Sequence, residues 1–417
     1  MSEARSPFAP LAGVRVLDFS KVLAGPLCTQ YLADLGAEVV KIEHIEGGDD
    51  TRQWPPFVDG TGTVFLSANR NKRSLALDLK SAEGRAVCHR LVAGADVVVE
   101  SFGPGVAARL QVDAETLAAC NPRLVHCSIS GFGATGPLRE GKGYDLVLQA
   151  YTGMLALTGE PDGAPARSPF SPVDQGTGMH ALSGILAGLL QRARTGRGVR
   201  VEASLFDTAA GFLGYILQGY WQRGTEPQRV GSAHESLCPY QSFETADRPL
   251  ILGVASDGLW RSFCAAAEAP QLAQREDLRT NAQRVARRRE VVAAVQAILA
   301  TRTRTEWMHL LHAHGIPCAP VHSIEEFAAD AHLKASGMVF EYPQANGADG
   351  PPLRGVAQPL RFDGERAGAR QRAPALGAHS AQVLAECGFS ADEIASLFTS
   401  GVVAAPTAFN DSPASTT

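Results

Sequence analysis

Asp174 is the residue in this sequence whose surroundings best suit covalent chemistry. It lies in Ser171-Pro-Val-Asp-Gln-Gly-Thr-Gly178, between a proline-containing loop and a run of small residues typical of a helix. One interpretation is structural: an aspartate at a helix start accepts backbone N–H bonds as an N-cap, and the local sequence alone favours this. The other is catalytic, because a carboxylate at a helix N-terminus stays ionised and nearby N–H groups can stabilise an oxyanion.

Two further short segments carry side chains that could bind a ligand. Lys142-Gly-Tyr144-Asp145 precedes a helix-like stretch, and as plain structure it is a loop with Asp145 as a cap. Residues 69–73 (NRNKR) form a dense basic cluster. Such a run is usually a solvated surface, although arginine also suits phosphate recognition through its forked donors.

Residues 131–136 (GFGATG) contain a literal G-x-G-x-x-G after a predicted strand. A dinucleotide site needs a helix that opens directly at these glycines, so that its N-terminus meets the pyrophosphate. Pro137, Gly141 and Gly143 follow instead, and no amphipathic helix begins there. We therefore favour a flexible glycine loop beside a pocket over a nicotinamide or flavin site.

The histidines and cysteines predict neither a metal site nor a thiol nucleophile. His234 and His314 stand alone, without the spacing of metal ligands. The eight cysteines include no C-x-x-C pair, and none has a nearby histidine motif.

The elements that position these residues alternate between strand and helix in the first half of the chain, which predicts an α/β fold with a largely parallel sheet. The predicted strands are Val14–Phe19, Glu38–Glu43, Ser74–Leu79, Asp96–Glu100, Leu124–Ser130 and Val199–Ala203. The predicted helices are Gly25–Asp34, Ala82–Ala93 and a small-residue helix over 176–193, which the cations and glycines near Arg192–Gly198 end.

The pattern changes after Gly224. We predict a large domain whose first part covers 1–224, a second, smaller domain over 225–330, and a C-terminal part over 331–403 with one helix near Ala381–Cys387. Residues 404–417 are expected to be a disordered tail.

Composition excludes several classes of protein. The chain of 417 residues is 45% hydrophobic and 19% charged, with a net charge of -5, which gives no reason to expect nucleic acid as a partner. No apolar run approaches the length of a membrane span, and the N-terminus lacks the apolar core of a signal peptide. We expect a cytoplasmic protein with reduced thiols and no membrane partner.

Seven ordered segments together resemble the class III CoA-transferase family, which includes formyl-CoA transferase, carnitine CoA-transferase and α-methylacyl-CoA racemase. The segments are VRVLDFSKVLAGPLCTQYLADLGAEVVKIE (14–43), NRNKRSLALDLKSAEG (69–84), ADVVVESFGPG (95–105), SISGFGATGP (128–137), GYDLVLQAYTGMLALTGEPDG (143–163), SPVDQGTGMHALSGILAGLLQRARTGRG (171–198) and HGIPCAPV (314–321).

The resemblance implies a Rossmann-like large domain with a smaller α/β domain, in a homodimer whose two chains interlock. It also implies that Asp174 is the catalytic nucleophile, because this residue matches the family's nucleophilic aspartate. Positions that match residues near the CoA are Phe102, Arg109, Lys142 and Tyr144, and the basic cluster through Arg70, Lys72 and Arg73 is expected to face the nucleotide half.

The activity implied is transfer of CoA from an acyl-CoA, with succinyl-CoA as one candidate donor, to a free carboxylic acid. Asp174 would pass through an acyl anhydride and an aspartyl-CoA thioester, with water excluded. No tightly bound cofactor is implied, since the CoA thioester is a substrate. A racemase or isomerase acting at the α-carbon is the alternative, and a non-catalytic CoA-binding protein is a third.

Two departures from the family pattern bear on the substrates. The racemase branch has a histidine where this chain has Tyr144, which favours transfer over racemisation. Formyl-CoA transferase has a glutamine where this chain has Leu23, and it has a tetraglycine segment that this chain lacks. We expect Leu23 and His234, the latter within 231–243, to face the acyl group, with dicarboxylates such as succinate or glutarate as the acids.

Overall fold

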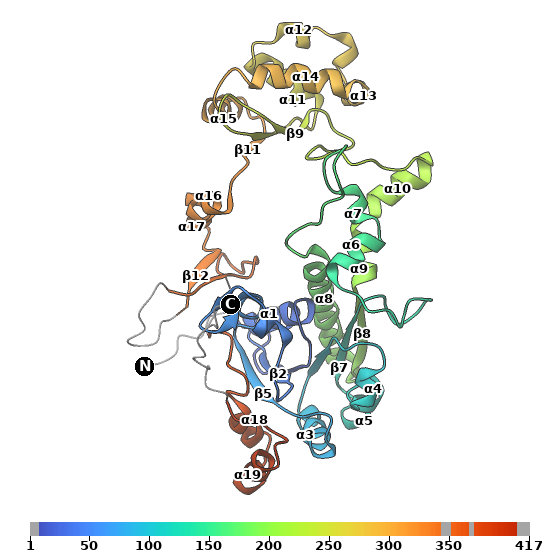
Figure 1. The fold of residues 1–417 in the computed structure, drawn as a ribbon, viewed down its shortest axis with the longest axis vertical. Coiled ribbons are helices and arrows are strands. Elements are labelled where there is room, and N and C mark those ends of the chain that lie inside the picture. The colour runs from blue at the N-terminus through green and yellow to red at the C-terminus, as the bar shows by residue number, and fades with distance from the viewer. Residues whose placement is uncertain (1–7, 343–351, 367–370, 407–417) are drawn as a thin grey trace, which may run out of the picture. The chain divides into compact units, whose positions relative to one another are not determined.

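The computed structural model describes residues 8–342, 352–366 and 371–406, so most of the predicted tail 404–417 lies outside them. The chain divides into two compact units (Figure 1). The larger unit takes residues 1–152, 169–215 and 334–417, and the smaller takes 153–168 and 216–333. The smaller unit thus extends beyond the range 225–330 expected from the sequence. It also includes residues 153–168, a separate segment that precedes the small-residue helix.

A six-stranded parallel sheet forms the centre of the larger unit, in the order β5-β2-β1-β6-β7-β8. Its strands are β1 (Arg15–Asp18), β2 (Glu38–Glu43), β5 (Lys72–Ala76), β6 (Val97–Glu100), β7 (Val125–Ser130) and β8 (Val199–Ser204). β6 is buried over its whole length, as its continuous VVVE run indicates, because helices cover both faces of a sheet of this kind. The predicted α/β class with a parallel sheet is confirmed.

Helices cover the two faces of this sheet. α1 (Ala24–Asp34) and α8 (Pro172–Thr195) pack on one face, where a Cβ on Gly188 would lie 2.8 Å from Val199 and 3.0 Å from Val125. On the other face, one apolar cluster joins strand residues such as Val98 to helix residues such as Leu91. The helices there are α3 (Ala82–Ala93), α5 (Ala114–Cys120), α18 (Ser380–Glu386) and α19 (Ala391–Thr399).

The C-terminal part of the chain returns to the edge strand β5. The N–H of His379 donates to the carbonyl of Ser74 at 3.0 Å, and the N–H of Ala404 donates to the carbonyl of Ala76 at 3.2 Å. α18 matches the helix expected near Ala381–Cys387, whereas α19 was not predicted. The remaining elements of the larger unit are short: η1 (Asp50–Gln53), β3 (Phe57–Val58), β4 (Thr61–Gly62), α2 (Thr63–Ala68), α4 (Val106–Arg109), α6 (Asp145–Tyr151), α9 (Leu205–Phe212), β12 (Val339–Glu341) and β13 (Arg354–Val356).

The smaller unit has its own core. Its antiparallel sheet has the order β11-β10-β9, and Trp260, Phe263 and Trp307 are almost fully buried among its helices. The elements are α7 (Met154–Leu157), β9 (Tyr240–Phe243), β10 (Leu250–Gly253), α11 (Asp257–Ala266), α12 (Pro270–Ala273), η2 (Glu276–Leu278), α13 (Asn281–Ala286), α14 (Arg288–Leu299), α15 (Arg304–Ala313), β11 (Cys318–Pro320) and α16 (Ile324–Ala329), while α10 (Gly214–Arg223) and α17 (Ala331–Ala335) cross the limits of the two units. Among the described residues, no helix combines the length and apolar character that crossing a membrane requires.

Candidate active site

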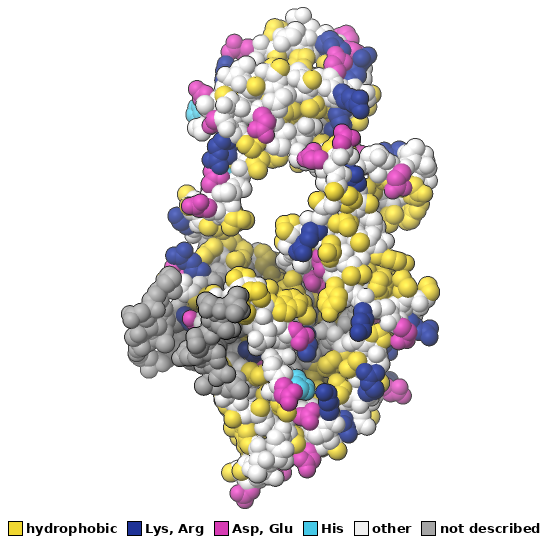
Figure 2. Space-filling view, in the orientation of Figure 1, with side chains coloured by type: hydrophobic (Ala, Val, Ile, Leu, Met, Phe, Trp, Pro, Cys, Tyr) yellow, Lys and Arg dark blue, Asp and Glu magenta, His cyan; other side chains and the backbone are white. Residues whose placement is uncertain are grey.

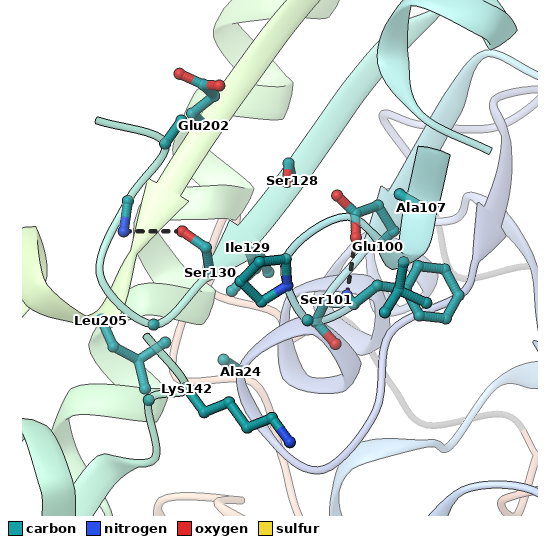
Figure 3. A pocket seen from close by; sticks show the side chains of 18 of the residues that line it. Ala24, Glu100, Ser101, Ala107, Ser128, Ile129, Ser130, Lys142, Glu202 and Leu205 are labelled. Atoms are coloured by element: carbon teal, nitrogen blue, oxygen red, sulfur yellow. Dashed lines mark hydrogen bonds between the residues drawn. The ribbon is translucent and has the colours of Figure 1, made fainter. Parts of the chain in front are cut away.

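A cavity of about 650 Å³ opens at the carboxyl ends of β1, β6 and β7 (Figure 3). The sheet continues from β1 to β2 on one side and to β6 on the other, so the strand order reverses between β1 and β6. Open α/β sheets bind their ligands outside the carboxyl ends of the strands at this point. The volume lies within the range of small-molecule sites.

Two loops border the cavity, residues 21–23 after β1 and 101–105 after β6. The N–H of Lys21 donates to Oγ of Ser101 at 2.9 Å, which joins the two loops. The N–H of Phe102 donates to the carboxylate of Glu100 at 2.8 Å, as Figure 3 shows. Both loops are therefore held in defined positions by the end of β6.

Asp174 lines this cavity from the first turn of α8. Ser171 is the N-cap residue of the helix, but its side chain makes no capping bond. Asp145, at the start of α6, supplies the cap: its Oδ2 accepts the N–H of Val173 at 2.8 Å and the N–H of Asp174 at 3.1 Å. The interpretation of Asp174 as the N-cap is therefore wrong, and Asp145 caps α8 instead of its own loop.

The environment of Asp174 favours its neutral form. Burial and, second, the negative charge of Asp145 raise the pKa of Asp174 from 3.8 to about 7. The expectation that this carboxylate stays firmly ionised at the helix N-terminus is corrected, because the N–H groups that would favour its charge bind Asp145. A carboxylate that titrates near neutral pH in a cavity has the character of a functional group.

Four other residues that we predicted for the site also line the cavity. Leu23 comes from the loop after β1, Phe102 from the loop after β6, and Lys142 and Tyr144 from the segment before α6. These residues come from three separate parts of the chain, and the structure brings them together with Asp174 around one space.

Lys72 does not reach this cavity, because it lies in β5 with its side chain completely buried. Its Nζ donates to Oδ2 of Asp18 at 3.0 Å and to the side chain of Asn69 at 2.8 Å. Burial lowers the pKa of Lys72 to about 8, against the attraction of Asp18. An ammonium group held in this way stabilises the sheet and has no free side toward a phosphate.

Arg70 and Arg73 are likewise engaged in ion pairs. Arg70 pairs with the buried Asp34 at 2.5 Å, and Arg73 pairs with Glu38 and Glu386. Neither residue lines the cavity. We therefore leave Arg70, Lys72 and Arg73 out of the CoA site proposed below.

Two predicted residues, Arg109 and His234, are not among those that line the cavity within the larger unit. Arg109 ends α4, and its Nη1 lies 3.6 Å from where a Cβ on Gly105 would stand, beside the loop after β6 but outside the lining of the cavity. His234 belongs to the smaller unit, where its ring lies edge-on to Tyr240 with centroids 5.7 Å apart.

The glycine-rich run 131–136 does not open a helix, and the next helix is α6 at Asp145. A Cβ on Gly131 would lie 2.5 Å from the backbone N of Gly143. Glycine at 131 thus permits the close approach of two loop backbones at the cavity wall. This is the role of a structural glycine loop, and it does not support the dinucleotide alternative.

Sequence reasoning missed Glu100, Ser101 and the capping role of Asp145. The signal for Glu100 was available, since a charged residue ends an otherwise apolar buried strand just before a turn containing Gly103 and Gly105. The role of Asp145 had no local signal, because its partners lie 28 and 29 residues further along the chain.

Sequence comparison assigns this chain to a family of enzymes. The model of CoA-transferase family III matches residues 11–380. The chain therefore belongs to CoA-transferase family III, and it is an enzyme that transfers CoA to a carboxylic acid.

The relatives agree with this assignment over most of their length. The chain is 39% identical to a succinate–glutarate CoA-transferase of Agrobacterium fabrum, covering 90% of this chain and 95% of that protein. It is 38% identical to a succinyl-CoA:mesaconate CoA-transferase of Haloarcula hispanica, covering 91% and 96%. A crystal structure of a CaiB/BaiF family protein from Brucella suis is similar with a TM-score of 0.80 and 36% identity, covering 91% of this chain and all of that one.

Proposed function

We propose that the enzyme moves CoA between dicarboxylic acids, with succinyl-CoA as a donor and Asp174 as the nucleophile. The single observation that carries the role of Asp174 is its position: it is a partly buried carboxylate in the cavity whose pKa is raised to about 7. The choice of acids rests on the relatives above, which act on succinyl-CoA, glutarate and mesaconate.

The first half of the reaction transfers CoA to the enzyme. An oxygen of ionised Asp174 attacks the thioester carbonyl of the donor, the C–S bond breaks, and CoA leaves as a thiolate. The thiolate then attacks the Asp174 carbonyl of the resulting mixed anhydride. The donor acid leaves as a carboxylate, and Asp174 becomes a CoA thioester.

The second half reverses these steps with the acceptor. The acceptor carboxylate attacks the carbonyl of the aspartyl thioester and releases the CoA thiolate. The thiolate attacks the acceptor's acyl carbon in the new anhydride, which yields the acceptor CoA thioester and restores Asp174. Every intermediate remains activated, so water must be kept away from them.

The rest of the cavity supports binding of the CoA thioester. Phe102 and Lys142 offer an apolar surface and a cation, and Tyr144 stands where the racemase branch has a histidine. The strand order of the large unit corresponds to the Rossmann-like order 3-2-1-4-5-6, and this supports a nucleotide-containing ligand at the switch point.

We further propose that the enzyme is a homodimer with interlocked chains. Aromatic and apolar side chains of the larger unit lie exposed on α6, α8 and α9 and beside them, namely Tyr151, Phe170, Met179, Phe212 and Tyr215. Figure 2 shows hydrophobic side chains gathered over the region where Figure 1 draws α6 and α9. We call these five residues the apolar face, and a second copy of the chain is the partner that would cover it.

The test is CoA transfer from succinyl-CoA to a panel of mono- and dicarboxylic acids by the wild type and by Asp174→Asn. Transfer should fall by at least about 10³-fold in the variant, because the amide cannot form the anhydride. Mass spectrometry of the wild type incubated with succinyl-CoA should detect a CoA adduct that the variant lacks.

Asp207→Asn is the matched control. Asp207 is also an aspartate in the first turn of a helix, and it accepts the Ser204 hydroxyl outside the cavity. Transfer by this control should stay within about twofold of the wild type. Equal transfer by Asp174→Asn and the wild type would reject Asp174 as the nucleophile. Deuterium exchange at the α-carbon without any transfer would favour the isomerase.

A further inference from the structure

The carboxyl end of β6 carries a buried carboxylate that the transfer chemistry does not use. Glu100 is the last residue of β6 and is only 4% exposed. Its Oε2 accepts the N–H of Phe102 at 2.8 Å. Figure 3 shows this carboxylate directed at the backbone of the loop that follows.

A second bond at the same place extends this connection to the other loop of the cavity. Oγ of Ser101 accepts the N–H of Lys21 at 2.9 Å. Glu100 thus fixes the start of loop 101–105, and Ser101 joins that loop to residues 21–23. The two loops that meet at the switch point between β1 and β6 are connected through one short stretch of chain.

We propose that Glu100 is a positioning residue that holds loop 101–105 in the conformation that binds CoA. The inference rests on the proposed function, since it requires that this cavity receives CoA. Glu100 acts through the backbone of Phe102, whereas Asp174 projects from α8, a different element. Loss of Glu100 should therefore weaken CoA binding and leave the chemical steps largely intact.

The physical reason is preorganisation. A loop already fixed in its binding conformation loses little conformational entropy when the ligand binds. Without the carboxylate, the N–H of Phe102 loses its acceptor, and the loop samples conformations that do not bind. Loss of a hydrogen bond to a charged group predicts a rise of about tenfold in Kd for CoA and in KM for the acyl-CoA.

The experiment measures CoA binding by calorimetry and transfer kinetics for the intact enzyme and for Glu100→Ala. We expect Kd for CoA and KM for succinyl-CoA to rise about tenfold, while kcat and KM for the acceptor acid change by less than about twofold. Glu100→Gln should restore most of the affinity, because its side-chain oxygen can still accept the N–H of Phe102.

Asp96→Ala is the control for a purely structural loss. Asp96 precedes β6 at the opposite end of the strand, and its Oδ2 accepts the N–H of Arg15 at the same distance, 2.8 Å. It lies outside the cavity. This variant should lose stability and keep its affinity for CoA. If Glu100→Ala does not fold, Ser101→Ala tests the same loop while the buried Glu100 carboxylate stays in place, with an expected rise in Kd of about threefold.

Three outcomes would overturn the inference. Equal Kd values for CoA in folded Glu100→Ala and Asp96→Ala would remove the positioning role, and so would a fall confined to kcat. In both cases transfer by the wild type would leave the proposed function standing. Failure of the wild type to bind CoA would reject the proposed function and this inference with it.

Discussion

At the scale of single residues, the site is organised around the two carboxylates at the start of α8. Asp145 receives two backbone N–H bonds from the helix, and Asp174 remains without that stabilisation. Of these two acidic residues, Asp145 caps the helix and Asp174, whose pKa is raised to about 7, faces the cavity. A carboxyl group with a raised pKa in a cavity is typical of a catalytic site.

This arrangement predicts a shift in the pH dependence of Asp145→Asn. Attack requires ionised Asp174, so kcat/KM of the wild type should fall as pH drops below about 7. Removal of the charge on Asp145 lowers the pKa of Asp174, while its burial continues to raise it. The acid limb of the pH profile of kcat/KM should therefore move to a value between about 4 and 7.

Comparison of Asp145→Asn with Asp145→Ala separates the effect of the Asp145 charge on Asp174 from its effect as the cap of α8. Asparagine caps a helix about as well as aspartate, whereas alanine costs about 1 kcal/mol. Asp145→Ala should show the same shift of the acid limb together with a lower free energy of unfolding. An acid limb that stays in place in both variants would contradict the influence of Asp145 on Asp174.

The residue types of the site could be predicted from the sequence better than their interactions. Asp174 and Phe102 were identified through segments shared with the family, and both line the cavity. Lys72 was expected to be free for a ligand, because its partner Asp18 lies 54 residues away and nothing local indicates the pairing. A sequence shows which residues are charged, but it does not show which opposite charges they meet after folding.

At the scale of elements, the close packing of α1 against α8 determines where Asp174 lies. A Cβ on Gly178 would lie 2.5 Å from the carbonyl oxygen of Ala24, so the two helices approach through backbone contact. Gly178 stands one helical turn after Asp174, and Ala24 lines the cavity. The separation of these helices therefore controls the distance from Asp174 to the loop after β1.

Gly178→Ala should force the helices apart. We expect the free energy of unfolding to fall by about 1–3 kcal/mol, as for other oversized substitutions in packed interiors, and transfer to fall as well. Urea denaturation and transfer kinetics measure the two effects.

Gly258→Ala is the comparison, since Gly258 lies in α11 and the atom nearest to an added Cβ is 3.7 Å away. The same substitution there should stabilise by roughly 0.5–1 kcal/mol, because alanine favours the helix. A Gly178→Ala protein as stable as the wild type would disprove the close contact.

Elements with a clear period were predicted closely. Glu38–Glu43 and Ala82–Ala93 have the same limits in the structure as in the sequence prediction. α8 was expected over 176–193 and begins at Pro172, because its cap comes from Asp145 and not from a residue of its own segment. The sequence therefore predicted that Asp174 precedes the helix, whereas in the structure it lies in the first turn. The difference arises from a contact between residues distant in sequence.

At the scale of the whole molecule, the apolar face predicts self-association. Tyr215 is 69% exposed and Phe170 is 64% exposed, which is unfavourable in contact with water. Light scattering should give the mass of two chains for the wild type. Tyr215→Glu should raise the dimer dissociation constant at least tenfold, because it places a charge in the contact.

Ile324→Glu is the control for this experiment, since Ile324 is 83% exposed in the smaller unit and is not part of the apolar face. It should leave the dimer intact. A monomeric wild type would rule out the homodimer, and equal weakening by both substitutions would rule out the apolar face as its contact.

The return of residues 377–404 to β5 has a consequence for synthesis on the ribosome. The hydroxyl of Ser380 accepts the N–H of Ala76, and these two residues are 304 positions apart. All six strands of the sheet have been translated by Ser204, yet the edge of β5 stays open until residues 377–404 have emerged. An open strand edge pairs readily with other chains. The nascent chain should thus be most prone to pairing with other chains before residues 377–404 are available to cover β5.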